Sequence, residues 1–227
     1  MRRVRSWCLA LVALSLASNA WALTPEFGVI AGMNLAKLNI EGRDHGELRT
    51  AFAAGGAFDL GLNDRFGVRI EPSFLSRGGK ASQRNAYWGS VDGAVFQLDY
   101  LAVPVLARYN LTAESIHPYV LGGLGFNFAT SQKAKLTAGP NHETVDLGDV
   151  YSPFDLTLDL GLGYNFPAAS NRLTVDARVA IGLLNINDGG TVTFNGSPLE
   201  VPDTSTHTLD FRLFATYFFP WSGGGSD

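Results

Sequence analysis

The chain has 227 residues, of which 46% are hydrophobic and 17% are charged, and it contains 26 glycines and 15 phenylalanines. This composition is too apolar for a disordered chain, and the apolar residues are too evenly interrupted for a bundle of membrane helices. The formal net charge of −4 argues against nucleic acid as a partner.

The first predicted element is an export signal over residues 1–22. MRRVR supplies three arginines, WCLALVALSLA supplies a short apolar core, and Ala20-Trp21-Ala22 places small residues at the two positions that a signal peptidase reads. An apolar core of about 11 residues is shorter than the roughly 20 that span a bilayer. Its removal would leave 14 Lys and Arg against 21 Asp and Glu, a formal charge of −7, and would remove Cys8, the only cysteine. The exported chain is therefore expected to fold without disulfides or thiolate metal sites.

The rest of the chain alternates apolar and polar residues rather than repeating every 3.6 residues. In FDLTLDLGLGYNF, Phe154, Leu156 and Leu158 form one set and Asp155 and Thr157 belong to the other. In a strand these two sets project to opposite faces. Eight segments show this pattern and are predicted to be strands: 27–35, 52–62, 66–74, 101–109, 118–128, 154–166, 173–183 and 208–219.

The connections between these strands alternate in length. Residues 36–51, 75–100, 129–153 and 184–207 are long and polar, whereas 63–65, 110–117 and 167–172 are short. Barrels of the outer membrane show this asymmetry, with short periplasmic turns and long extracellular loops. We therefore predict an all-β, eight-stranded antiparallel up-and-down transmembrane β-barrel over residues 23–219, with both ends at the short turns and a short flexible tail over 220–227.

The face that points outward decides between two kinds of barrel, because a soluble lipocalin-like binder has the same period with its apolar set inward. The polar set is rich in glycine, contains no lysine and has nearly balanced charges, which suits ion pairs in a closed interior better than a water-facing sheet. The predicted lumen charge network comprises Asp59, Arg69, Glu71, Arg108, Asp159, Asp176, Arg178, Asp210 and Arg212.

Aromatic residues of the apolar set favour the membrane as well, because they fall at the strand ends near the short turns. Such a placement is typical of the girdle at a membrane interface. The predicted interfacial aromatics are Phe27, Phe66, Tyr109, Tyr164, Phe166, Tyr217 and Phe219. The lipocalin-like alternative stays open, although the chain lacks the G-x-W strand opening and the closing helix of that family.

Five stretches carry a resemblance to a known family: FGVIAGMNLAKL, RIEPSFLSRGGK, DYLAVPVLARY, HPYVLGGLGFNF and VDARVAIGLLNI. Together they resemble the outer-membrane beta-barrel domain family, whose members are also called porin-family or PorT-like proteins. The resemblance implies an eight-stranded barrel in the outer membrane of a Gram-negative bacterium, with outer-membrane lipids and the barrel insertion machinery as partners. It implies no defined activity and no cofactor. The chain differs by ending PWSGGGSD after Phe219, where many such proteins stop at the aromatic residue.

Three functions are compatible with this barrel. It is expected to be a non-enzymatic scaffold for four surface loops, serving envelope integrity or binding at the surface, with the lumen charges forming a salt-bridged plug. A narrow pore for ions or small solutes would use the same charges as a selectivity lining. A lipid-modifying barrel enzyme would use His207 with Thr206 and Asp203.

The long connections contain few other signals. The histidines are neither spaced as H-x-x-x-H nor accompanied by a nearby cysteine, so no metal site is expected at His45, His117, His142 or His207. Asn195-Gly196 lies between two short extended pieces and predicts a hairpin beyond the membrane. Tyr87 and Trp88 are candidates for surface recognition. The sequence specifies no extracellular ligand.

Overall fold

The computed structural model describes residues 24–41, 47–82, 92–112, 117–168 and 171–220. The predicted export signal, His45, Tyr87, Trp88 and residues 221–227 of the predicted tail lie outside this part of the chain. Pro220 ends the last strand.

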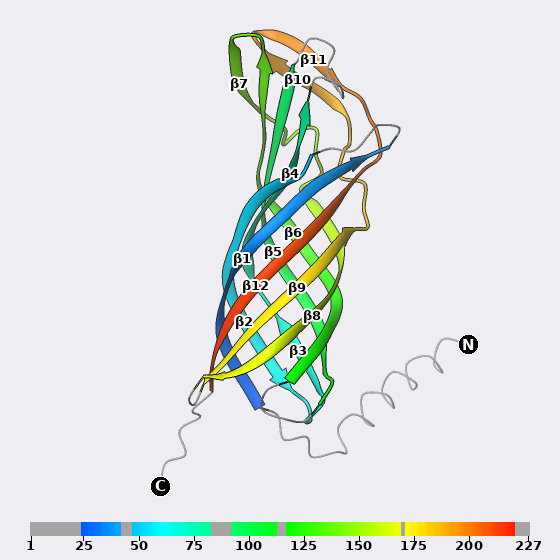
Figure 1. Cartoon of the computed structure of the whole chain (residues 1–227). Helices are drawn as coiled ribbons and strands as arrows, with labels where there is room; N and C mark the ends of the chain where they lie inside the picture. Colours follow the sequence, from blue (N-terminus) through cyan, green and yellow to red (C-terminus); the bar gives the residue numbers. More distant parts are fainter. Residues whose placement is uncertain (1–23, 42–46, 83–91, 113–116, 169–170, 221–227) are drawn as a thin grey trace, which may run out of the picture.

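The described residues form one closed barrel with an extension at one end (Figure 1). Every wall strand is antiparallel to its neighbours, and the first strand pairs with the last over fifteen residue pairs, which closes the ring. This confirms the predicted eight-stranded up-and-down barrel. The strands are β1 (Thr24–Ile40), β2 (Arg49–Gly61), β3 (Phe66–Ile70), β4 (Ser73–Ser82), β5 (Gly93–Asn110), β6 (His117–Ala138), β7 (Asn141–Asp146), β8 (Phe154–Ala168), β9 (Asn171–Gly182), β10 (Gly190–Phe194), β11 (Ser197–Val201) and β12 (Thr206–Pro220).

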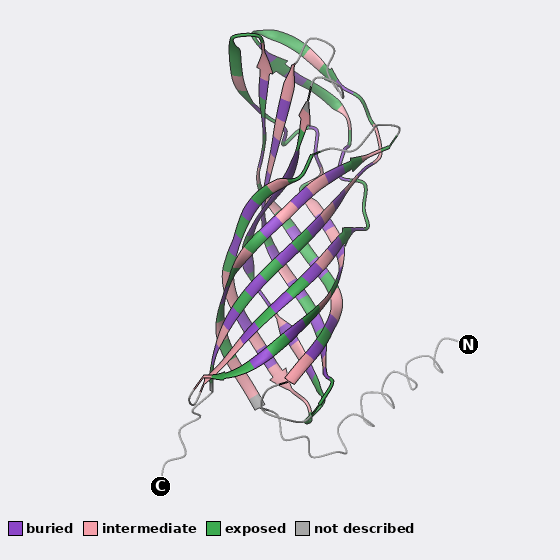
Figure 2. Cartoon of the chain, viewed as in Figure 1, coloured by how far each residue is buried: buried purple, intermediate pink, exposed green. Residues whose placement is uncertain are grey.

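Burial alternates along each wall strand, as the sequence pattern predicts (Figure 2). On β8, Asp155, Thr157 and Asp159 are fully buried, whereas the side chains of Leu160 and Leu162 are 50% and 67% exposed. Large apolar side chains are exposed in the same way on all the other wall strands. An apolar belt of this extent around a closed sheet requires hydrocarbon outside it, and closure satisfies the backbone there.

The predicted strand 66–74 is interrupted in the structure. β3 ends at Ile70 and β4 begins at Ser73, so Glu71 and Pro72 separate them. Proline has no N–H for the ladder, which explains why regular pairing stops there. The wall stays continuous because both strands pair with β2 on one side and β5 on the other, and the Gly56 N–H donates to the Pro72 carbonyl at 2.9 Å.

The predicted connections 36–51, 75–100 and 129–153 are not simple loops, because wall strands continue into each of them. β4 and β5 extend above the belt, and β6 runs on to Ala138 and turns at Gly139, where φ is +58°, into β7. In these extended parts, β5 and β6 bury apolar residues on their inner face, and β4 and β6 carry lysines on their outer face. Their alternation therefore persists, but the outward set is polar beyond the membrane, which gives the sequence the composition of a loop.

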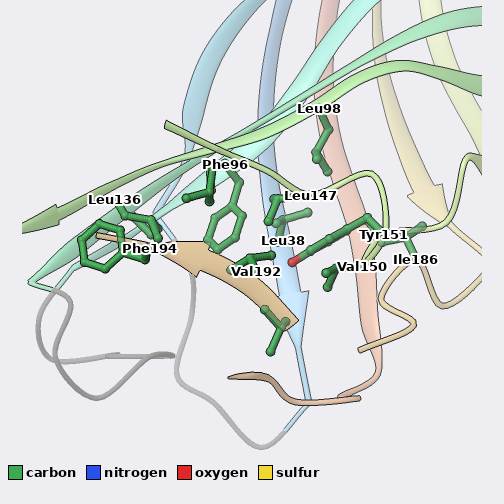
Figure 3. Packing of buried hydrophobic residues seen from close by; sticks show 14 of the residues in the cluster. Leu38, Phe96, Leu98, Leu136, Leu147, Val150, Tyr151, Ile186, Val192 and Phe194 are labelled. Atoms are coloured by element: carbon green, nitrogen blue, oxygen red, sulfur yellow. The ribbon is translucent and has the colours of Figure 1, made fainter. Parts of the chain in front are cut away.

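The extension has an apolar core of its own (Figure 3). Phe96 and Leu98 of β5, Leu136 of β6 and Tyr151 pack together there, along with Val192, Phe194 and Val201 of the last long connection. The last three residues belong to the β10–β11 hairpin, which confirms the turn predicted at Asn195-Gly196. Both turn residues have positive φ, +49° and +73°, as a two-residue hairpin of type I′ requires.

Candidate functional site

The lower half of the lumen holds a closed network of ion pairs centred on Asp59. Arg69 donates to Asp59 Oδ2 from Nε and Nη2 at 3.0 and 2.9 Å, Arg108 Nη2 donates to Oδ1 at 3.1 Å, and Arg172 Nη2 donates to Oδ2 at 3.0 Å. Arg172 also pairs with Glu26. One carboxylate on β2 therefore binds arginines from three other strands.

The same network continues across the barrel through Glu71 and Asp176. Arg178 holds Glu71 by two parallel hydrogen bonds of 2.5 and 2.8 Å and also pairs with Asp176. Arg69 lies 3.8 Å from Glu71 and 3.6 Å from Asp176. This lower network thus contains four carboxylates and four guanidinium groups: Glu26, Asp59, Glu71 and Asp176 with Arg69, Arg108, Arg172 and Arg178.

A second network lies nearer the extension. Arg77 donates to Asp155 at 2.7 Å and to Asp210 at 2.6 Å, and Arg212 donates to Asp159 at 2.8 Å and to Asp210 at 2.7 Å. Thr208 donates a further hydrogen bond to Asp155 at 3.0 Å. This upper network contains three carboxylates and two guanidinium groups.

An apolar cluster lies between the two networks on the side of β1, β2, β4, β5 and β12, whereas Arg178 of the lower network and Arg212 of the upper network are neighbours in register on β9 and β12. It consists of Ile30, Ala53, Leu75, Ala102 and Phe214, all of them buried. Phe214 lies between Arg212 and Thr216 in the inward set of β12, and the Arg178 guanidinium stands 4.9 Å above its ring. Ion pairs below, apolar side chains between and ion pairs above fill the interior, as expected of a barrel with only eight strands.

All nine predicted network residues are buried, and the structure divides them between the two networks. Asp59, Arg69, Glu71, Arg108, Asp176 and Arg178 lie in the lower network, and Asp159, Asp210 and Arg212 lie in the upper one. Sequence reasoning missed Arg77, which falls in a predicted loop, and Glu26 and Arg172, which lie at or beyond predicted strand ends. It placed Asp155 in the inward set without including it among the charges. The aromatic rings of Phe214 and Phe218 also face inward, where Arg69 stacks 5.0 Å from Phe218.

The predicted interfacial aromatics line the end of the barrel where the turns are short. The rings pack in pairs, with centroids 4.9 to 5.1 Å apart. The pairs are Phe66 with Tyr109, Tyr164 with Phe166, Tyr217 with Phe219, and Phe27 with Phe58 of β2. A second row of large apolar residues, which the sequence analysis did not single out, marks the other end of the belt: Phe74, Leu101, Phe128 and Phe154 are paired in register across four strands.

The histidines lie apart from one another. His207 Nε2 is 3.2 Å from Ser205 Oγ, whereas the hydroxyl of Thr206 is buried and donates to the Thr204 carbonyl at 3.0 Å. In the described ranges, no hydrogen bond joins Asp203 to His207, so the three residues named for the enzyme alternative are not linked as a triad. His117 contacts Asn165, and His142 contacts Thr137. No group of three or more His, Cys, Asp or Glu residues within those ranges is arranged to hold a metal ion.

The closed sheet, its apolar outer belt and its charged, filled interior define an integral β-barrel of the bacterial outer membrane. The chain belongs to a family described as the outer membrane protein beta-barrel domain, whose family model matches residues 15–188. Comparison with curated protein sequences finds no match.

Among solved structures the chain is similar to small outer-membrane barrels. The crystal structure of Ail, the attachment invasion locus protein of Yersinia pestis, has 15% identity and a TM-score of 0.42, over 86% of this chain and 98% of that one. OprG from Pseudomonas aeruginosa has 10% identity and a TM-score of 0.46, over 87% and 95%. The Neisserial surface protein NspA has 15% identity and a TM-score of 0.44, over 85% and 97%.

Proposed function

We propose that the protein is a non-enzymatic barrel that anchors its extracellular extension in the outer membrane, for envelope integrity or for binding at the cell surface. The observation that carries the proposal is the filled lumen: two ion-pair networks and the apolar cluster between them occupy the interior. Such a plug joins the wall strands to one another and blocks the path of solutes through the lumen, so it suits a rigid anchor better than a pore.

The extension supports the same proposal because it is itself a packed structure. The β6–β7 and β10–β11 hairpins enclose the apolar core, and the backbone N–H of Asn195 donates to Glu143 at 2.6 Å, which joins the tips of the two hairpins. An ordered surface of this kind presents side chains in fixed positions. The Ser205–His207 contact has no carboxylate partner among the described residues, so it gives catalysis little support.

Single-channel recording tests this proposal against the narrow pore. We expect the purified exported chain, residues 23–227, to give no steady conductance in planar bilayers, because breaking the buried pairs to admit water and ions is costly. Insertion is verified on the same samples by resistance of the barrel to protease and by a gel mobility that changes on heating. A steady conductance from verified, inserted protein would favour the pore and contradict the plug.

A further inference from the structure

The two lumen networks differ in their charge balance. The lower network pairs four carboxylates with four guanidinium groups, so it is neutral. The upper network holds the three carboxylates of Asp155, Asp159 and Asp210 but only the two guanidinium groups of Arg77 and Arg212. All five side chains are buried, so the upper network has one uncompensated negative charge inside the barrel. An uncompensated charge in such a place is costly.

The neighbouring basic residues do not supply the compensating charge. Within the described ranges, Arg77 and Arg212 are the only basic side chains within 4.0 Å of the three carboxylates. Arg49 of β2 is close by, but it donates to the Ser76 hydroxyl at 3.1 Å, and that hydroxyl donates to Asp99 at 2.6 Å. Arg49 and Asp99 therefore balance each other, and the excess charge stays with the upper network.

The hydrogen bonds of the upper network identify where the excess charge lies. Asp210 Oδ2 accepts hydrogen bonds from Arg77 and Arg212, and Asp155 Oδ2 accepts from Arg77 and Thr208. The other oxygen of each carboxylate, Oδ1, is buried and has no donor. Within the described ranges these are the only two buried carboxylate oxygens without a donor, and neither belongs to the lower network. Charge balance and hydrogen bonding thus point to the same two residues.

Two buried amide oxygens adjoin these carboxylates. Asn127 is in register with Asp155, and its Nδ2 donates to the Asp155 backbone carbonyl at 3.2 Å, while its Oδ1 has no donor. Asn34 is in register with Arg212, two residues along β12 from Asp210, and its Oδ1 also has no donor. Both asparagines are fully buried in the inward set. All four atoms without a donor are oxygens, two of them charged and two neutral, which is the kind of ligand that hard cations take.

We propose that the upper network binds one Na⁺ ion between Asp155 Oδ1 and Asp210 Oδ1, with the amide oxygens of Asn34 and Asn127 as neutral ligands. Arg77 holds the two carboxylates side by side, at 2.7 and 2.6 Å. A monovalent ion is favoured because the network needs one positive charge, whereas a divalent ion would leave an excess of the opposite sign. The inference goes beyond the anchoring role, because it assigns an ion to the plug, and it does not depend on conductance.

The test is the dependence of stability on Na⁺. Residues 23–227, folded in vesicles of a zwitterionic lipid, are unfolded by urea in sodium chloride and in the chloride of N-methylglucamine, a cation too large for a buried site. The ionic strength is kept equal, so that screening is equal. Because the ion binds the folded chain, each tenfold rise in Na⁺ above its dissociation constant should raise the ratio of folded to unfolded protein about tenfold. N-methylglucamine should leave this ratio unchanged.

Asp155→Asn removes the excess charge and keeps the size of the side chain. The upper network is then neutral without an ion, so the variant should fold and its stability should no longer depend on Na⁺. Asp64→Asn is the matched control, because it removes an exposed acid outside both networks and should keep the full response to Na⁺. Gel mobility before and after heating verifies that each variant is folded.

Three outcomes would overturn the proposal. The first is equal stability of the unchanged chain in Na⁺ and in N-methylglucamine, in which case a stability that depends on pH would assign the compensating charge to a proton. The second is a full response to Na⁺ in the folded Asp155→Asn variant. The third is loss of the response in Asp64→Asn, which would place the ion outside the upper network.

Discussion

Asp59→Asn is expected to lower the free energy of unfolding by about 3 to 5 kcal/mol, the usual cost of removing one partner from a buried ion pair. Asp59 binds Arg69, Arg108 and Arg172, and the lower network is neutral only while all four of its carboxylates are charged. The asparagine keeps the size of the side chain but leaves four guanidinium groups, three of them buried, facing three carboxylates. Unfolding by urea in lipid vesicles, followed by gel mobility, measures the change.

Asp64→Asn is the matched control for this variant. Asp64 is an exposed acid in the turn between β2 and β3, and its carboxylate belongs to neither lumen network. We expect its loss to change stability by less than about 0.5 kcal/mol, as is usual at the surface. Equal stabilities for the two variants would mean that the lower network does not hold the barrel together.

Gly55→Ala is expected to destabilise the barrel, whereas Gly56→Ala should be nearly neutral. A Cβ on Gly55 would lie 2.3 Å from the Pro72 carbonyl oxygen and 2.4 Å from the Ser73 Cα, both backbone atoms that cannot move aside alone. A Cβ on Gly56 points outward and would meet nothing closer than 3.9 Å. Overpacking of this kind costs about 1 to 3 kcal/mol. The temperature at which gel mobility changes gives the comparison.

These two neighbours also test which face of β2 is inside. Gly55 belongs to the inward set and Gly56 to the outward set, so a single methyl group is added on either side of the same wall. If Gly56→Ala proved the more damaging variant, the assignment of the inner and outer faces of β2 would be wrong.

The membrane part of the fold was predictable because one physical rule governs it. Between the two apolar rows, lipid outside the wall favours apolar side chains and the crowded interior favours small or polar ones. Apolar and polar residues therefore alternate, and strands such as 154–166 can be recognised in the sequence. Above the membrane the outward side chains are polar and the inward ones apolar: Lys133 and Lys135 are exposed, and Leu136 is buried in the extension core. A bulge at Asp99 and Tyr100 also shifts the pairing of β5 with β6 at this level. For both reasons, a search for strands with an apolar outward face does not find the parts of β4, β5 and β6 above the membrane.

The sequence predicted most of the residues of the charge networks but not which of them form ion pairs with one another. Alternation assigns Asp159 and Arg212 to the interior, yet only register reveals that Arg212 also reaches Asp210 and that Arg77 joins the same group. The inward rings of Phe214 and Phe218 were hidden for another reason. In LFATYFF both faces of the strand carry aromatic residues, so hydrophobicity alone does not distinguish the lumen from lipid.

Refolding with and without an amphiphile tests the central claim most directly. That claim is that the apolar set of every wall strand contacts acyl chains while the charged set fills the lumen. Residues 23–227, diluted from urea, should acquire the heat-sensitive gel mobility of a folded barrel in lipid vesicles or detergent and should aggregate in plain buffer. A folded, monodisperse monomer in plain buffer would contradict the account, because the apolar set would then have to face inward.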